Sequence, residues 1–285
     1  MYIGATTHIL MDDIPLSEVL RRMADTGFEG GELSLNHLRQ FVDSETPEAD
    51  AERTRELADS LGLLLPQSHL TMADIACIDD ARRQAELATI EREIELSALA
   101  GAEIGVLHPG GGFPATLAEY QEVERVRIDS YTRACEIAAR YDFTIAIENT
   151  YDAHGDETSA VGRRRFGAII PELHEVIDAV DADNFGICLD TGHTNLFGLP
   201  LGESLRQCGD RLIATHVHDN DGHADQHIEP TRGTIDWQDG VAALHEVGWD
   251  GIFNLEIAPL RGHPIEAQML RMRQVVESAR WLLEQ

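Results

Sequence analysis

The feature that most constrains the fold is an alternation of short apolar runs with longer segments of helical period, which repeats about eight times along the 285 residues. The apolar runs predict strands at 2–6, 28–35, 63–69, 103–108, 143–148, 184–190, 212–218 and 251–257. The segments between and after them predict helices at 16–25, 47–61, 79–100, 115–141, 169–180, 201–208, 237–247 and 264–283. Eight such units predict one α/β domain over residues 1–285, a single (β/α)8 TIM barrel.

The rival architecture is a doubly wound open sheet, which usually carries a glycine-rich phosphate loop directly after its first strand. The first predicted strand is followed here by THILMDDIP, which contains no glycine. The barrel is therefore the favoured fold.

Residues able to bind a metal stand at the end of six consecutive predicted strands, from the third to the eighth. They are His69, His108, Glu148, Asp190 (followed by His193), the pair His216 and His218, and Glu256. In a (β/α)8 barrel the carboxyl ends of the strands meet around one axis, and the active site lies there. The sequence therefore predicts that these side chains form one site.

Residue size along two strands supports an inward direction for the acids. Glu148 shares its face of the strand with Ala146, and Asp190 shares its face with Cys188, whereas Ile147 and Leu189 lie on the opposite faces. Small residues suit the barrel interior and large apolar residues suit the helix layer. We expect Glu148 and Asp190 to point into the barrel mouth.

The stretch from 211 to 237 is the richest in candidate ligands. His216 and His218 share a strand face, and Asp225 and His227 follow in the next loop. Imidazole and carboxylate groups together are the usual donors for Zn, Mn or Co. His218 is nearer the strand end and is the predicted ligand, with His216 supporting it from one layer below.

Several motifs together resemble the xylose isomerase-like barrel superfamily, the sugar phosphate isomerase/epimerase group that also contains endonuclease IV. They are ELSL (with Glu32), LHPG, IENT, LDTGHTN, HVHDNDG, GTIDW and LEI. The resemblance implies a shared metal site formed by Glu148, Asp190, His218 and Glu256. It also implies a divalent cofactor, with Mn, Zn or Co favoured and Mg left open, and a dimeric or tetrameric assembly.

Within this resemblance, the activity implied first is the isomerisation or epimerisation of a sugar or a sugar derivative. A divalent ion chelated by a carbonyl and its neighbouring hydroxyl stabilises an enediolate, while a carboxylate moves the proton. Glu148 and Glu256 are the predicted catalytic acids and bases. Ketose 3-epimerases of the family carry a second glutamate six positions after the strand-five ligand, where this chain has His154, so that narrow activity is not expected.

Five further residues leave the function open, because they either contact substrate or hold additional metal ions. They are His69, His108, His193, Asp225 and His227. With the four shared ligands, they match the nine-ligand pattern of the three-zinc endonuclease IV site. The alternatives are therefore a multi-zinc phosphodiesterase of that class and a non-catalytic sugar-binding barrel.

Two other residues are candidate contacts for an anion or for substrate. Arg232 lies in the loop after the seventh strand, and Glu32 ends the second strand, where it could bind a sugar hydroxyl or orient His69. The run from Arg163 to Arg165, in the loop after the fifth strand, is interpreted as pairing with nearby acids.

Composition limits the partners and the setting of the protein. The net charge is -29, and all 22 basic residues are arginine, which favours a halophilic protein from a salt-accumulating cytoplasm over an acidic protein from a GC-rich genome. So acidic a chain is poorly suited to bind nucleic acid. No apolar run is long enough to span a membrane, and the amino terminus lacks the basic start of a signal peptide. We expect a cytoplasmic enzyme acting on a small molecule, with four unpaired cysteines.

Overall fold

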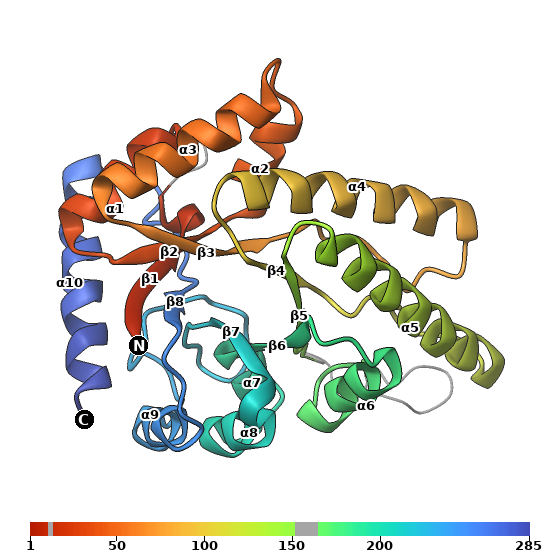
Figure 1. Ribbon diagram of the computed structural model, residues 1–285. Coiled ribbons are helices and arrows are strands. Elements are labelled where there is room, and N and C mark those ends of the chain that lie inside the picture. The colour runs from red at the N-terminus through yellow and green to blue at the C-terminus, as the bar shows by residue number, and fades with distance from the viewer. Residues whose placement is uncertain (11–13, 152–164) are drawn as a thin grey trace.

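The computed structural model describes residues 1–10, 14–151 and 165–285, and within them eight parallel strands form a nearly closed barrel (Figure 1). The strands are β1 (Tyr2–Thr6), β2 (Gly30–Leu33), β3 (Leu64–His69), β4 (Ile104–Leu107), β5 (Thr144–Glu148), β6 (Phe185–Asp190), β7 (Leu212–His216) and β8 (Ile252–Leu255). They run in the order β7-β6-β5-β4-β3-β2-β1-β8. Past the end of β7, a bridge between Val217 and Leu255 brings the two edge strands together.

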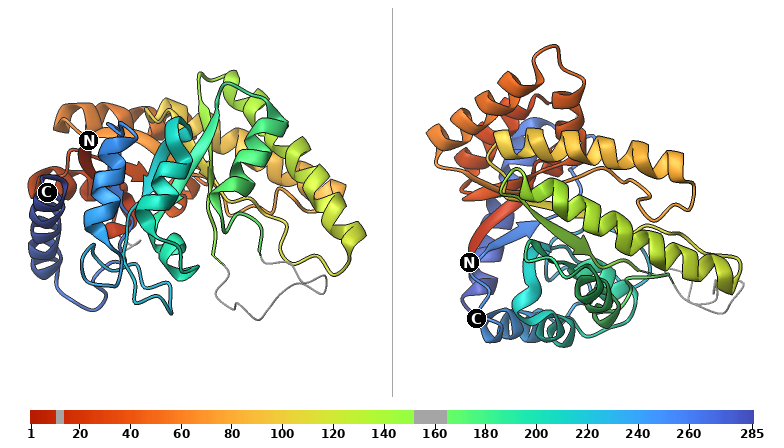
Figure 2. Two further views of the ribbon diagram at one scale, coloured as in Figure 1. Left: turned by 90° about the horizontal axis from the view of Figure 1, so that it is seen from below. Right: turned by 45° about the vertical axis from the view of Figure 1, so that its right-hand side comes forward.

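Helices follow the strands and cover the outside of the barrel (Figures 1 and 2). They are α1 (Leu16–Thr26), α2 (Leu35–Val42), α3 (Pro47–Leu61), α4 (Asp80–Leu99), α5 (Leu117–Ala139), α6 (Ile170–Val180), α7 (Thr191–Leu196), α8 (Leu201–Cys208), α9 (Trp237–Glu246) and α10 (Ile265–Leu283). In the left view of Figure 2, the loops that follow β7 and β8 lie at the same lower edge. The predicted (β/α)8 TIM barrel is confirmed.

The helix boundaries follow local capping chemistry. Helix α5 begins with a capping box. The Thr116 hydroxyl accepts a hydrogen bond from the backbone nitrogen of Glu119, and the Glu119 carboxylate accepts one from the backbone nitrogen of Thr116. Helices α1 and α3 end at Gly27 and Gly62, both in the left-handed conformation that glycine adopts without strain. These signals lie in the sequence, which is why most predicted boundaries agree with the structure.

Two short helices, α2 and α7, were not predicted, and several strands are shorter than expected, among them β2 and β7. The strand predicted over 28–35 is only Gly30–Leu33, because α2 begins at Leu35. The strand predicted over 212–218 ends at His216, so His218 lies beyond the ladder. The carboxyl end of each of these two strands comes two residues early, where the backbone leaves the sheet, and β2 also begins two residues late.

The barrel has an inner and an outer apolar layer, as the alternation along the strands predicts. Ala146 and Cys188 form a small buried cluster with Val106 and Ala214. The isoleucines and leucines at the neighbouring strand positions, such as Ile147 and Leu189, face the other way and belong to the large core between sheet and helices. The direction predicted for Glu148 and Asp190 from the size of their neighbours is therefore consistent with the core.

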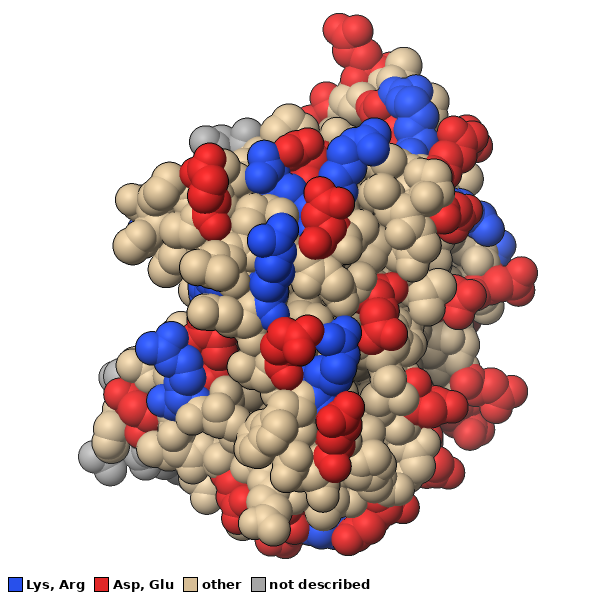
Figure 3. Space-filling view, turned by 90° about the vertical axis from the view of Figure 1, so that its left-hand side faces the viewer, with Lys and Arg blue, Asp and Glu red and all other residues tan. Residues whose placement is uncertain are grey.

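The surface carries arginines interspersed among a larger number of acids, as seen on the face that includes α10 (Figure 3). On α5, Arg125 forms ion pairs with Glu122 and Asp129, three and four residues away. The four cysteines are free, and three of them are buried. Among the described residues, no helix combines the length and the apolar character needed to cross a membrane.

Glu93 on α4 is a buried acid outside the barrel mouth, and it predicts a pH-dependent stability. Its carboxylate accepts a hydrogen bond from the backbone nitrogen of Thr71 at 2.7 Å. Burial raises the pKa of Glu93 from 4.5 to about 7. The unfolded chain therefore ionises first, and folding stability falls as pH rises from about 4.5 to about 7.

Replacing Glu93 by Gln removes this ionisation. We expect the variant to gain stability relative to the wild type as pH rises, by up to roughly 3 kcal/mol between pH 5 and pH 8. Urea unfolding of both proteins across this pH range, in constant salt, measures the difference. A stability difference that is the same at pH 5 and pH 8 would contradict the prediction.

Candidate metal centre and active site

The predicted strand-end residues gather at the carboxyl ends of the strands. Within the described residues they form four groups of three whose ligand atoms lie within 4.8 Å of one another. The groups are His69, His108 and Glu148; Glu148, Asp190 and His193; Asp190, His216 and Glu256; and His218, Asp225 and His227. Because Glu148 and Asp190 each belong to two groups, three of the groups are linked into one cluster.

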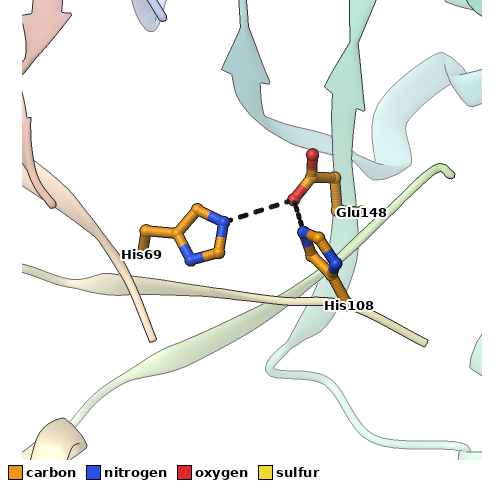
Figure 4. A group of neighbouring side chains, drawn as sticks. All are labelled: His69, His108 and Glu148. Atoms are coloured by element: carbon orange, nitrogen blue, oxygen red, sulfur yellow. Dashed lines mark ion pairs between the residues drawn. The ribbon is translucent and has the colours of Figure 1, made fainter. Parts of the chain in front are cut away.

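Glu148, at the end of β5, is the buried centre of this cluster. One carboxylate oxygen, Oε2, faces His108 Nε2 at 3.0 Å and His69 Nε2 at 3.7 Å (Figure 4). The other, Oε1, lies 3.2 Å from His216 Nδ1 and 3.4 Å from His193 Nδ1. Burial alone would raise the pKa of Glu148, but His108 and His216 hold it well below its usual range. Glu148 is therefore a carboxylate shared among four imidazoles.

The two histidines at the end of β7 face different parts of the cluster. His216 Nδ1 lies between Glu148 and Glu256, at 3.2 Å and 3.5 Å. His218 Nε2 lies 3.1 Å from Asp190 and 4.0 Å from Asp225. The sequence suggested that His218 joins the two glutamates, whereas the structure places His216 between them. The cause is the early end of β7, which leaves His216 at the last position of the ladder.

An outer group, formed by His218, Asp225 and His227, extends the cluster toward solvent, and His193 lies beside it. Asp225 Oδ2 lies 3.2 Å from His227 Nε2 and 3.8 Å from His193 Nε2. Burial lowers the pKa of an imidazole, but the surrounding acids outweigh this and raise the pKa of His193 to about 10 and that of His227 to about 9. Burial raises the pKa of Asp190, but the neighbouring His193 and His218 outweigh this and lower it to about 2.

Local structure fixes the residues of this outer group. The Asp190 side chain caps α7 by accepting from the backbone nitrogen of His193 at 2.7 Å, which places His193 beside it. Gly192 is required because a Cβ there would lie 1.9 Å from the His218 ring. The buried carboxylate of Asp219 accepts from the Trp237 indole at 2.8 Å, which holds the loop after β7 against α9.

The ring nitrogens indicate how the histidines would bind a cation. The Nδ1 atoms of His69, His193 and His227 each lie 2.8 to 2.9 Å from a backbone carbonyl oxygen. In His69 and His227, a proton on Nδ1 leaves Nε2 with its lone pair toward Glu148 and Asp225, which is the usual arrangement of metal-bound histidines. His216 is reversed, with Nε2 at 2.8 Å from Glu32 and Nδ1 toward the acids.

Several polar atoms of the cluster approach one another without forming hydrogen bonds of acceptable geometry. Glu148 Oε2, His216 Nδ1 and His218 Nδ1 are buried and have no hydrogen-bond partner, although Glu148 Oε2 lies 3.0 Å from His108 Nε2. Buried polar atoms are rarely left unpaired. The donor atoms of Asp190, His216 and Glu256 lie within 4.8 Å of one another, and such carboxylate and imidazole donors fit a divalent cation.

The two remaining predicted contacts lie apart from each other. Glu32 is fully buried beneath the cluster and contacts His216, not His69. Arg232 is on the surface, where it pairs with Glu229 at 3.0 Å. A cavity of about 440 Å³ is nevertheless lined by both Arg232 and His227, so the arginine lies beside the outer group. The candidate epimerase position His154, and Arg163 and Arg164, lie outside the described residues.

The barrel mouth also contains residues that were not singled out from sequence, among them His8, Asn36, Met72 and Tyr151. A cavity of about 190 Å³ beside the cluster is lined by Thr6, His8, Glu32, Ser34, Leu35, Asn36, His69, Met72 and Glu256. The Tyr151 ring packs on His193 with 4.8 Å between centroids. His8 and Asn36 lie two and three residues past the ends of β1 and β2, so the rule that strand ends form the site could have identified them.

The fold is a (β/α)8 barrel whose strand ends carry a cluster of acids and histidines that could hold a metal ion. The chain belongs to the xylose isomerase-like TIM barrel family, whose model matches residues 20–285. It is 31% identical over 191 residues to the uncharacterised protein MJ1311 of Methanocaldococcus jannaschii, covering 66% of this chain and 57% of that protein. It is 24% identical over 266 residues to D-psicose 3-epimerase of Enterocloster bolteae, covering 90% of this chain and 81% of that enzyme.

Solved structures share the fold over almost the whole chain. A D-tagatose 3-epimerase-like protein superposes with a TM-score of 0.79 at 22% identity, covering 100% of this chain and 98% of the other. The IOLI protein with a bound zinc atom superposes with a TM-score of 0.76 at 18% identity, covering 99% and 96%. At these identities the likeness establishes the barrel.

The fit to a cation predicts a metal-dependent melting temperature. Metal at about 100 times its dissociation constant stabilises a folded protein by about 2.7 kcal/mol, equivalent to about 4–5 °C in a chain of this size. We expect Mn²⁺ or Zn²⁺ to raise the melting temperature of chelator-treated protein by this amount. Differential scanning fluorimetry measures the shift. The Glu148→Gln variant should lose most of it, and an equal shift in both proteins would contradict the assignment.

Proposed function

We propose that the protein is a divalent-metal-dependent isomerase or epimerase that acts on a sugar or a sugar derivative. The observation that carries the proposal is the convergence of Glu148 and Glu256, from β5 and β8, on His216 Nδ1 at 3.2 Å and 3.5 Å. Two carboxylates around one imidazole nitrogen, with Asp190 in the same group, provide both a cation site and two proton carriers.

The relatives support this class of activity. D-psicose 3-epimerase is named for the epimerisation of a ketose, and the alignment to it covers most of both chains. The IOLI structure contains a zinc atom in the same fold. The family's sugar epimerases and the imidazole–carboxylate donors of this chain therefore favour the same chemistry, with Mn, Co or Zn as the metal.

The ligand residues proposed for the central site are Glu148, Asp190, His216 and Glu256. His218 was the histidine expected from sequence, but it faces Asp190 and Asp225 instead. A cation held in the central site would act as a Lewis acid toward a carbonyl and a neighbouring hydroxyl, and would acidify the adjacent C–H.

The carboxylates supply the proton transfer in this proposal. Glu148 is buried and its pKa is held low, so it remains ionised, as a carboxylate that holds a cation must be. Glu256 is partly exposed, at 22% of its side chain, and lines the cavity of about 190 Å³ beside the cluster. A substrate in this cavity would meet Glu256 first. His8, Asn36 and Met72, in the same wall, would contact its distal hydroxyls and carbons.

A second candidate function is the hydrolysis of a phosphodiester by a multi-zinc site. The observation that favours it is the separate outer group of His218, Asp225 and His227, together with the inner group of His69, His108 and Glu148. A proton-transfer enzyme with one metal does not require these additional donors. The net charge of -29 opposes a nucleic-acid substrate.

The metal content of the purified protein separates the candidates. Elemental analysis without chelator would support the proposal with about one Mn or Co per chain, followed by a panel of ketoses and inososes. Two or three Zn per chain would favour the phosphodiesterase, and an abasic-site cleavage assay would then come first. A loaded protein that binds sugars but catalyses neither reaction would indicate a non-catalytic sugar-binding barrel.

Replacing Glu256 by Gln should leave the protein folded but lower turnover at least about 100-fold, because general acid–base catalysis by one side chain contributes at least that much. The incorporation of deuterium from D2O into the substrate measures the proton transfer directly. The matched control is Glu266→Gln, an exposed glutamate in the first turn of α10, which should exchange deuterium at the wild-type rate. Wild-type exchange by the Glu256 variant would exclude its assigned role.

A further inference from the structure

Glu32, at the end of the short strand β2, is a fully buried carboxylate beneath the cluster. Its Oε2 atom accepts from His216 Nε2 at 2.8 Å and from Gln67 Nε2 at 2.6 Å. Burying a carboxylate destabilises the fold unless hydrogen bonds compensate. A carboxylate kept in this position therefore requires an explanation beyond core packing.

The contact with Glu32 determines which nitrogen of His216 faces the site. A neutral imidazole carries its proton on one nitrogen and a lone pair on the other. Because Nε2 faces a carboxylate that accepts two hydrogen bonds, the proton belongs on Nε2. The lone pair is then on Nδ1, which has no hydrogen-bond partner and lies between Glu148 and Glu256.

His216 differs in this respect from the other oriented histidines of the cluster. His69, His193 and His227 have Nδ1 next to a backbone carbonyl, which any sequence provides. For His216 the partner is the side chain of Glu32, so the orientation of this ring depends on one residue, which can be changed by mutation.

Gln67 on β3 holds Glu32 in place. Its Nε2 atom contacts Glu32 Oε2 and, at 3.4 Å, the carbonyl oxygen of Thr215, the residue before His216. Glu32 and Gln67 are direct neighbours in the pairing of β2 with β3. The chain of contacts therefore crosses the barrel interior from β3 through β2 to β7 and fixes both the acid and the ring.

We propose that Glu32 is a positioning residue that orients His216 and fixes its tautomer, so that Nδ1 is presented to the metal. The inference rests on the proposed function, since it requires a cation at the central site. It replaces the sequence-based interpretation of Glu32 as a substrate contact: the carboxylate acts through His216 and strengthens metal binding from below.

The test measures metal affinity in the Glu32→Gln variant, whose side chain is nearly isosteric but uncharged. Competition of Co²⁺ with a chromophoric chelator gives the dissociation constant without any assay of turnover. We expect Co²⁺ affinity to fall about 10- to 100-fold, the usual effect of losing the carboxylate behind a metal-bound histidine. We also expect the visible Co²⁺ spectrum of the saturated variant to change, since the ring is held less firmly.

The matched control is Glu93→Gln, which also removes a buried carboxylate, but one that contacts the backbone of Thr71 and no histidine of the cluster. It should bind Co²⁺ as the wild type does and give the same spectrum. A purely structural role for Glu32 would lower only the melting temperature of the metal-free variant, so wild-type affinity and spectrum in Glu32→Gln would overturn the inference.

If Glu32→Gln does not fold, Gln67→Met provides the second test, because it removes the donor that holds Glu32 but leaves the carboxylate in place. Weaker Co²⁺ binding by this variant would support the inference, and unchanged binding would overturn it. Failure of the wild type itself to bind Co²⁺, Mn²⁺ or Zn²⁺ would instead reject the proposed function, and the inference with it.

Discussion

The constraint on which the rest of the structure depends is the burial of acids at the barrel mouth. Glu32, Glu148 and Asp190 are all within 1% of complete burial, and an isolated ionised carboxylate in such a place would destabilise the fold by several kcal/mol. The acids are tolerated because imidazoles surround them: four contact Glu148, and His193 and His218 lie against Asp190. Acid and imidazole are therefore required together, and a cation between them would satisfy the atoms that remain unpaired.

The parallel barrel is what brings these groups together. Strands β5 to β8 each contribute one acid or histidine, and no two neighbouring contributors are close in sequence, so only closure of the sheet makes them a site. The small residues of the inner layer, Ala146, Cys188 and Ala214, leave room for the larger polar side chains above them. On the exterior, several arginines pair with acids three or four residues away on the same helix.

The sequence was sufficient to predict the fold and the identity of most cluster residues, because both depend on periodicity and on position at strand ends. It was insufficient for the choice between His216 and His218, since both have the same parity and only the last position of the β7 ladder separates them. The partner of Glu32 was equally inaccessible, because it lies 184 residues away and across the barrel. Helix α7 was missed because its first residues, TGH, resemble a loop, although Asp190 caps it.

The outer group is where functions within this fold can diverge. Asp225 and His227 come from one loop, between β7 and α9, whose path is fixed by Asp219 and by Gly233, where a Cβ would lie 2.1 Å from a backbone oxygen. The central acids are held by strands, whereas these two ligands depend on a loop. A change in that loop would move Asp225 and His227 without disturbing β5 to β8. The strand-end acids are therefore positioned by the sheet, whereas the placement of Asp225 and His227 depends on the β7–α9 loop.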